Sequence, residues 1–462
     1  MHASLFRPFS APRALFALVL LAGPLGASAA CSSSDDATPG TGDAGPGSGS
    51  GEGGAGSSSG GASSGGASSG GSSSGAPNVE PGARCRGTTR TVATDVAQPP
   101  TVPQSLAVPA GFVLEGLASL TSPRHLAALP NGDLLVGTQG NVVMLVPHAD
   151  GDRAGTPTEF VRIDDAPLNG VTFDAPNCTV YVGSQHGIYR IAYEDGMTRA
   201  EPGEPIARVR PGGEGGHVTT SVAVSGGMLY AGVGSVCNAC TETDPTRATV
   251  QRMNLDGTGM ATFATRIRNP IGLTVNANTG TLWVGNAGQD SLPAGHPYEF
   301  FDAIGTHTAG VDYGWPECEE NRKAYVTGAD CSNTVEPDVV LPAFSTLISA
   351  AFYPSSPTGA HAFPAEYRGG AFVAARGAWH ETDGKYFSPP RIAFVKMNGD
   401  APATAVDWND PTTQWSEFVS GFELPDRATR VARATGTAIG TDGSLFVSDD
   451  DAGLLLRVRP AR

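Results

Sequence analysis

The sequence predicts an all-β fold, a six-bladed β-propeller with loop insertions, preceded by a signal peptide and a flexible linker. Past Pro109, short β-rich segments alternate with Gly, Pro, Asn and Asp turns, and amphipathic helix patterns are almost lacking. One hairpin pattern recurs six times, and its first four copies are spaced at roughly the 40 to 50 residues of a propeller blade. Residues 1–78, by contrast, have a composition that predicts no packed core.

Residues 1–30 have the features of a secretory signal peptide. Arg7 and Arg13 precede the apolar run 14–27, which is too short to span a bilayer, and small residues follow it. Cys31 comes directly after those small residues, which predicts cleavage before Cys31 and lipidation of its thiol; cleavage without lipidation is the alternative. We therefore expect an exported lipoprotein, in the outer membrane, the periplasm or at the cell surface, that meets the membrane only through its anchor.

Residues 31–78 predict a flexible tether, because they are mostly Gly, Ser, Ala and Thr. Residues 79–462 are predicted to form the propeller. The formal net charge is −16, from 29 Lys and Arg against 45 Asp and Glu. Nucleic acid is not an expected partner, since it requires a basic surface.

Six cysteines follow Cys31, and an even number in an exported protein predicts disulfides. The simplest of many connectivities joins Cys237 with Cys240, Cys318 with Cys331, and Cys85 with Cys178. The Cys237–Cys240 spacing also occurs in redox motifs and haem attachment sites. Haem attachment requires a histidine where Thr241 stands, and a redox motif requires a βαβ context. A disulfide that closes a loop is therefore the favoured interpretation.

The repeated hairpin is the main evidence for the propeller. Its copies run from Pro123 to Gly137, Asn169 to Gly183, His217 to Gly234, Asn269 to Gly285, Ala350 to Gly377 and Arg433 to Ser448. Each copy has a polar or Pro-containing start, an alternating strand, a turn, and a second apolar strand. Closing six such blades into a ring removes exposed sheet edges. A jelly roll or a pair of sandwiches would not predict a hairpin at this period.

The first residues of the copies should converge near the propeller axis. They are Arg124 with His125, Asn169, His217, Arg268 with Asn269, and Arg433. Such residues can simply cap strands. A histidine, arginines and amides around one axis also provide a general base, cations and hydrogen-bond donors, which are the parts of a ligand pocket.

Residues 108–459 resemble the soluble pyrroloquinoline quinone (PQQ)-dependent sugar dehydrogenases, specifically the glucose and sorbosone dehydrogenase-like group. The motifs that carry the resemblance are PRHLAALPNGDLLVG from Pro123, the glycine-flanked His217, RIRNPIGL around Arg268, YGWPEC from Tyr313, YRGGAFVA from Tyr367, and DGSLFVSDD from Asp442. In that family a six-bladed propeller holds the quinone at its axis, so the resemblance implies the same fold and cofactor here.

The resemblance assigns catalytic roles to His217 and Arg268. His217 stands where the family has its general base, which takes the proton of a substrate hydroxyl while hydride passes to the quinone. Arg268 would stabilise negative charge on the quinone oxygens, and Asn269 would hydrogen-bond the same region. The structural alternatives are a histidine at a strand end and an ordinary arginine ion pair.

The resemblance also implies further cofactor contacts. Arg433 matches one of two family arginines on the cofactor, and the second falls on Thr435. Arg376 and Trp379 lie where related proteins place a cation and sometimes an aromatic residue. An amide donor before the second blade falls on Asp165 or Asn169. His125, His186 and His380 receive no role.

The family holds Ca²⁺ through two consecutive backbone carbonyls, which correspond here to Gly288 and Gln289. Asp290 and Glu299 are expected to add hard oxygen ligands of the kind that Ca²⁺ prefers. The alternative is a solvated acidic loop.

The expected function is an exported quinoprotein oxidoreductase that oxidises an aldose or polyol hydroxyl and passes electrons to a separate acceptor, since nothing resembles an attached cytochrome domain. One alternative is a non-catalytic propeller that binds a ligand or protein partner. Another is a calcium-dependent lactonase, because fold alone does not determine chemistry. The lactonase is less favoured, since the blades begin with Arg, His and Asn rather than with acidic ligands.

Overall fold

The computed structural model describes residues 83–211, 215–293 and 295–462. The predicted signal peptide, Cys31 and the linker lie outside these residues. The described residues form strands and four short 3-10 helices, η1 (Ala83–Cys85), η2 (Ala175–Asn177), η3 (Ile304–Thr306) and η4 (Ala365–Tyr367). No helix in the described part of the chain is long and apolar enough to cross a membrane.

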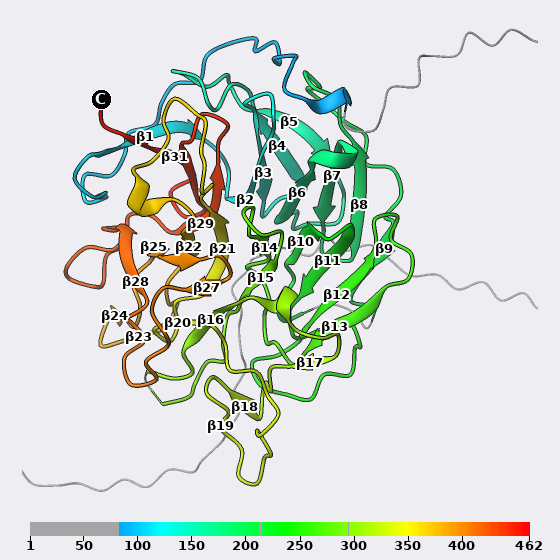
Figure 1. The fold of residues 1–462 in the computed structure, drawn as a ribbon, viewed down its shortest axis with the longest axis vertical. Helices are drawn as coiled ribbons and strands as arrows, with labels where there is room; N and C mark the ends of the chain where they lie inside the picture. The colour runs from blue at the N-terminus through cyan, green and yellow to red at the C-terminus, as the bar shows by residue number, and fades with distance from the viewer. Residues whose placement is uncertain (1–82, 212–214, 294) are drawn as a thin grey trace, which may run out of the picture. The chain divides into compact units, whose positions relative to one another are not determined.

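Six sheets form the blades of a propeller, and Figure 1 shows them arranged around a common centre. Blade 1 contains β2 (Pro123–Ala128), β3 (Leu134–Thr138), β4 (Val142–Val146) and β5 (Thr158–Arg162). Blade 2 contains β6 (Gly170–Asp174), β7 (Thr179–Gly183), β8 (Gly187–Ala192) and β9 (Ala207–Arg208). Blade 3 contains β10 (Thr220–Ser225), β11 (Met228–Val233), β12 (Thr249–Asn254) and β13 (Ala261–Thr265), with β17 (Val311–Asp312) parallel to β13.

The second half of the ring carries the insertions. Blade 4 contains β14 (Thr274–Val275), β15 (Leu282–Gly285), β16 (Glu299–Asp302) and β20 (Val339–Leu341). Blade 5 contains β21 (Leu347–Phe352), β22 (Ala371–Ala375), β25 (Arg391–Val395) and β28 (Trp415–Val419). Three small hairpins lie between these strands: β18 (Cys318–Glu319) with β19 (Lys323–Ala324), β23 (Glu381–Thr382) with β24 (Lys385–Tyr386), and β26 (Met397–Asn398) with β27 (Ala401–Pro402).

Blade 6 closes the ring with strands from both ends of the propeller sequence. Its inner strands are β29 (Ala434–Ile439), β30 (Leu445–Asp449) and β31 (Leu454–Pro460), and its outer strand is β1 (Phe112–Ser119). β1 and β31 are antiparallel, with Phe112 opposite Pro460 (Figure 1). The six predicted hairpins are the inner two strands of the six blades, which confirms the predicted fold.

The innermost strands β2, β6, β10, β14, β21 and β29 contact one another in ring order. They surround a central channel of about 340 Å³, lined by residues of all six strands. Strands β7 (TVYVG) and β22 (AFVAA) are buried at every position, because neighbouring blades cover both faces of each sheet. This explains why the strands are almost continuously apolar.

The glycine that ends most of the hairpin copies is required by close packing between blades. A Cβ added to Gly137 would lie 2.4 Å from the carbonyl oxygen of Asn169, and one added to Gly183 would lie 2.4 Å from that of Thr220. Each of these backbone oxygens belongs to the next blade. A larger residue would therefore push adjacent blades apart at the axis.

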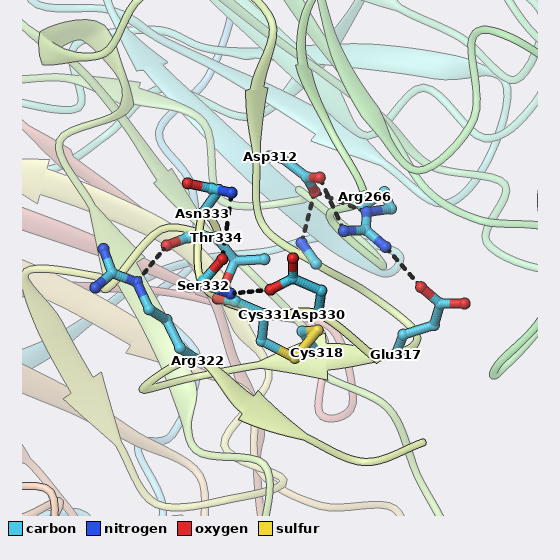
Figure 2. The surroundings of a disulfide bond; sticks show 11 residues. Arg266, Asp312, Glu317, Cys318, Arg322, Asp330, Cys331, Ser332, Asn333 and Thr334 are labelled. Atoms are coloured by element: carbon cyan, nitrogen blue, oxygen red, sulfur yellow. Dashed lines mark hydrogen bonds and ion pairs between the residues drawn. A yellow bond between two sulfur atoms is a disulfide. The ribbon is translucent and has the colours of Figure 1, made fainter. Parts of the chain in front are cut away.

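The three predicted disulfides are present. Cys85 bonds Cys178, Cys237 bonds Cys240, and Cys318 bonds Cys331. Figure 2 shows the surroundings of the Cys318–Cys331 bond, where Arg266 pairs with Asp312 and Glu317. This disulfide closes the insertion that carries the YGWPEC motif.

Candidate functional site

Gly234 is the point at which the first residues of blades 3 and 4 meet. A Cβ added to Gly234 would lie 2.5 Å from Cβ of His217 and 2.6 Å from Oδ1 of Asn269. The next residue, Ser235, donates its backbone N–H to the carbonyl oxygen of Arg268 at 2.8 Å. The structure therefore brings His217, Arg268 and Asn269 together, as the repeat predicts.

Ser235 determines which nitrogen of His217 carries the proton. Nδ1 of His217 lies 3.0 Å from the carbonyl oxygen of Ser235 and 3.0 Å from its hydroxyl. The hydroxyl donates its own proton to the carbonyl oxygen of Cys237 at 2.6 Å. Both Ser235 oxygens therefore act as acceptors, so Nδ1 carries the hydrogen and Nε2 keeps its lone pair.

The surroundings of His217 keep the imidazole neutral. Burial, and after it the charge of Arg268, lowers the pKa of His217 to about 3. Arg210 and Arg247 act in the same direction. A half-buried histidine with an unprotonated Nε2 is suited to accept a proton.

The guanidinium of Arg268 is held from three sides. Nε donates to the carbonyl oxygen of Asn238 at 3.1 Å, and Nη1 donates to that of Ala287 at 3.2 Å. Nη2 donates to Oδ1 of Asn238 at 2.9 Å and to Oδ2 of Asp290 at 2.8 Å. Because all three guanidinium nitrogens of Arg268 donate hydrogen bonds, the buried cation has one defined orientation.

The RNP turn also fixes Asn269. Its backbone N–H donates to Oδ1 of Asn286 at 3.0 Å, and its carbonyl oxygen accepts from the N–H groups of Ile271 and Ala287. The side-chain amide is buried beside Gly234. These hydrogen bonds use only the backbone of Asn269. Its side-chain amide lies beside His217, next to Gly234.

Asn169 and Asp165 are the two alternatives for an amide or acid before blade 2, and the structure distinguishes them. Asp165 accepts from Ser184 and from the backbone N–H of His186, and it pairs with Nδ1 of His186 at 2.8 Å. Asn169 is buried, and neither its Oδ1 nor its Nδ2 has a partner among the residues that the structure describes. A buried amide without partners is costly, so Asn169 is the better candidate to contact a ligand.

Blades 1, 5 and 6 contribute an arginine cluster around Asp450. Oδ2 of Asp450 lies 2.9 Å from Nε of Arg124 and 2.9 Å from Nη2 of Arg376. Arg433 donates to the carbonyl oxygens of Arg376 and Gly377 at 3.2 and 3.1 Å. Burial and the neighbouring Arg376 lower the pKa of Arg433 to about 9, and Arg433 borders a cavity of about 400 Å³. Arg124 and Arg376 share the carboxylate of Asp450, and Arg433 lies against the backbone of Arg376, so three arginine side chains gather here.

Thr435 and Trp379 lie differently from the predicted cofactor contacts. Thr435 is fully buried, and its hydroxyl donates to the carbonyl oxygen of Pro123 at 3.0 Å. It fills the interface of blades 1 and 6, so we do not include it in the site. Trp379 is 64% exposed and stacks on His380 with ring centroids 3.7 Å apart. Nδ1 of His380 lies 3.5 Å from Oδ1 of Asp290, which connects this stack to Arg268.

Two buried carboxylates face the predicted calcium segment. The backbone N–H of Gly288 donates to Oε2 of Glu299 at 2.7 Å. A Cβ added to Gly288 would lie 3.5 Å from that oxygen and 3.6 Å from Oε2 of Glu319. Oε1 of Glu319 and Oε1 of Gln289 are buried without a partner among the described residues. Oxygen atoms from two buried carboxylates therefore lie beside Gly288, next to Gln289 in the chain.

The electrostatics of this carboxylate pair favour a cation. Burial raises the pKa of Glu299 to about 8. Burial also raises the pKa of Glu319, and the nearby carboxylate of Glu299 raises it further. Asp290 is less available, because its carboxylate pairs with Arg268. Glu319 is not among the residues predicted from the sequence, although it directly follows the YGWPEC motif.

One protein-family model matches part of this chain. Residues 106–324 match the model of the family described as TrAA12-like. The matched residues include β1, blades 1 to 3 and the first three strands of blade 4, and they contain His217, Arg268, Asn269 and the carboxylate pair. No curated protein matches the chain.

Solved structures confirm the resemblance at the level of the fold. A calcium structure of the Trichoderma reesei carbohydrate-active enzyme of family AA12 matches with a TM-score of 0.62 at 18% identity, over 81% of this chain and 100% of that one. The holo PQQ domain of pyranose dehydrogenase from Coprinopsis cinerea matches with 0.63 at 16% identity, over 79% and 98%. The PQQ-bound aldose sugar dehydrogenase of Streptomyces coelicolor matches with 0.51 at 20% identity, over 76% and 99%.

Proposed function

We propose that this protein is an exported quinoprotein oxidoreductase, which oxidises a hydroxyl group of an aldose or polyol by hydride transfer to PQQ. The observation that carries the proposal is the arrangement of His217 and Arg268. Ser235 holds the Nδ1 proton of His217, so the basic Nε2 is available next to a fixed guanidinium. Solved propellers of the same fold are a pyranose dehydrogenase and an aldose sugar dehydrogenase with PQQ, which supports a sugar substrate.

The residues around the axis fit a quinone that carries three carboxylates. Arg376 and Arg433 would pair with its carboxylates, since Arg376 shares Asp450 with Arg124 and Arg433 lies against the backbone of Arg376. The quinone would supply the hydrogen-bond partners that the buried amide of Asn169 does not find among the described residues, and Asn269 would bond the same group. When bound, the quinone supplies the electrophilic carbon that receives the hydride.

The protein side chains divide the remaining chemistry between them. Nε2 of His217 accepts the hydroxyl proton of the substrate, and Ser235 keeps the ring in the required tautomer. Arg268, oriented by Asn238, Ala287 and Asp290, stabilises negative charge on the oxygens of the acceptor. The positive charge of Arg268 also disfavours a proton on His217 before substrate arrives.

We also propose that Ca²⁺ binds between the backbone carbonyls of Gly288 and Gln289 and the carboxylates of Glu299 and Glu319. Support comes from the two partnerless buried oxygens and from the raised pKa values of the carboxylates, because Ca²⁺ prefers several hard oxygen ligands. A structure of the Trichoderma family AA12 enzyme contains calcium, which agrees with this assignment.

Reconstitution tests the function. PQQ and Ca²⁺ are titrated calorimetrically into cofactor-free protein, and dye-linked oxidation is then measured with a panel of aldoses and polyols. We expect saturable binding and sugar-dependent dye reduction. His217→Ala should lower kcat by roughly 1,000-fold, the range for a lost general base, with quinone affinity almost unchanged.

The control for this variant is His307→Ala, since His307 pairs with Asp302 rather than with the residues that begin the hairpin copies. It should leave both binding and kcat unchanged. Wild-type protein that neither binds the quinone nor oxidises any sugar would contradict the proposed function.

Export and lipidation at Cys31 are part of the proposal. Three disulfides within one propeller are typical of proteins from oxidising compartments, which supports export. Electrons would pass to a separate acceptor. Mass spectrometry of protein from the membrane fraction should show a lipid-modified N-terminal cysteine, and Cys31→Ser should release the protein into the soluble fraction.

A further inference from the structure

The loop between β11 and β12 contains a residue that contacts both sides of the candidate site. Oδ1 of Asn238 accepts from Nη2 of Arg268 at 2.9 Å and from the backbone N–H of Asp290 at 2.7 Å. Nδ2 of Asn238 donates to the carbonyl oxygen of Asp290 at 2.9 Å. Asn238 therefore binds Arg268 and also fixes the backbone of the acid that pairs with Arg268.

The same asparagine joins two distant motifs of the sequence. Its carbonyl oxygen accepts from Nε of Arg268 and from the indole Nε1 of Trp315, each at 3.1 Å. Arg268 belongs to the RIRNPIGL segment and Trp315 to the YGWPEC segment. The backbone N–H of Trp315 also donates to the carbonyl oxygen of Arg266 at 3.0 Å, so the two segments lie against one another.

The disulfide Cys237–Cys240 closes a small ring that includes Asn238. On one side of the ring, the carbonyl oxygen of Cys237 accepts from the hydroxyl of Ser235, the residue that orients His217. On the other side, Asn238 holds Arg268. Ser235, which orients His217, and Asn238, which holds Arg268, are therefore only three peptide bonds apart, and the last of these bonds lies within the ring.

We propose that Asn238 is a positioning residue for Arg268, and that the Cys237–Cys240 disulfide keeps Asn238 in place for this role. The inference rests on the proposed function and goes beyond it, because it assigns a part of the active site to a loop outside the motifs shared with the family. Arg268 donates two of its four hydrogen bonds to Asn238. A long side chain that loses such partners regains rotamer freedom and no longer presents a fixed fork.

The test compares two variants of the loop with two matched controls in the full chain. Asn238→Ala removes the side-chain bonds, and Cys237→Ser with Cys240→Ser removes the ring. Asn177→Ala is the control for the first, since the side chain of Asn177 bonds only Asp174 in the described residues, at the β6–β7 turn. Cys85→Ser with Cys178→Ser is the control for the second, because that disulfide joins η1 to the same turn.

The first readout needs no cofactor. In cofactor-free, ¹⁵N-arginine-labelled protein, the guanidinium N–H signals of Arg268 (Nε, bonded to the backbone carbonyl of Asn238, and Nη2, bonded to its side chain), assigned with Arg268→Lys, report their exchange with water. We expect this exchange to accelerate by about 10-fold or more in both loop variants and to stay unchanged in both controls. The second readout is catalysis, where the loop variants should lose roughly 10- to 100-fold in kcat with a smaller change in KM.

Exchange and kcat within about twofold of wild type in both loop variants would overturn the proposal. A general loss of stability is recognised by a fall in melting temperature that the Cys85 and Cys178 control shares. If wild-type protein binds no quinone, the proposed function fails on its own. The exchange experiment then still decides whether Asn238 positions Arg268.

Discussion

Ser235 contacts His217 through both of its oxygen atoms, each 3.0 Å from Nδ1. Replacing Ser235 by Ala removes the hydroxyl and keeps the carbonyl oxygen, so the tautomer is retained while the ring is held less firmly. We expect kcat to fall by about 3- to 10-fold, much less than for His217→Ala. Steady-state kinetics with a saturating sugar measure this difference. An equal loss in both variants would show that the hydroxyl has a more direct role.

Arg268→Lys should be nearly as damaging as the loss of the whole side chain. Lysine cannot donate simultaneously to Asn238, Ala287 and Asp290, because it lacks the planar fork. We expect kcat/KM to fall by roughly 100-fold, as for the loss of an oriented donor to a developing oxyanion. Arg266→Lys is the matched control, since Arg266 pairs with Asp312 and Glu317 outside the site (Figure 2). It should keep kcat/KM close to wild type.

The Glu299 and Glu319 pair makes a prediction about stability with and without calcium. Glu319→Gln removes one of two mutually repelling buried acids, so the metal-free protein should melt at the same temperature or higher. The same change removes a proposed ligand, so the rise in melting temperature on adding Ca²⁺ should largely disappear. Scanning calorimetry with calcium and with chelator measures both effects. A calcium-dependent rise equal to that of wild type would exclude Glu319 as a ligand.

Gly234→Ala should impair the site more than the fold. The new methyl group would lie 2.5 Å from Cβ of His217 and 2.6 Å from Oδ1 of Asn269, so at least one of them must move. We expect kcat to fall by roughly 100-fold, the effect of a displacement of about 1 Å. Gly140→Ala is the control, because within the described residues a Cβ added there would lie no closer than 3.5 Å to its nearest neighbour, the hydroxyl of Thr138. Its kcat and melting temperature should match wild type.

His125 predicts how stability depends on pH. Burial lowers its pKa to about 4 from 6.5, with a smaller contribution from the charge of Arg124, and its Nε2 lies 2.7 Å from the carbonyl oxygen of Ile348. Between these two pH values the unfolded chain binds a proton that the folded chain does not. The free energy of unfolding should therefore fall as pH decreases from 6.5 towards 4, by at most about 1.4 kcal/mol per pH unit from this group.

Urea denaturation at several pH values between 7 and 5 measures this slope, and His125→Asn should make it shallower. His217 contributes in the same direction, because its pKa is also lowered. An unchanged slope in the His125 variant would assign the pH dependence to other groups.

The sequence by itself determined the repeat, the order of the blades and the hairpins that build them. These features are local, since the alternation of apolar residues, the turn residues and the strand-final glycines all lie within about 15 to 20 residues of one another. Two disulfides join cysteines that are near in sequence, and the third joins the remaining pair, Cys85 and Cys178, which are 93 residues apart. His217, Arg268 and Asn269 were found because they occupy the same position in successive repeats.

Only the tertiary structure decided which other side chains reach the site. Three of these side chains do not belong to the first residues of a hairpin copy: those of Asn238, Glu319 and Asp450. Their partners are about 30 to several hundred residues away in sequence. Thr435, by contrast, was predicted to contact the cofactor but lies in the interior. The pairing of β29 with β30 shifts register between Ala434 and Gly436, so the hydroxyl of Thr435 is directed to Pro123 in the interior. Because side chains alternate across a strand, a shift of one residue reverses the face, and pattern alone does not reveal such a shift.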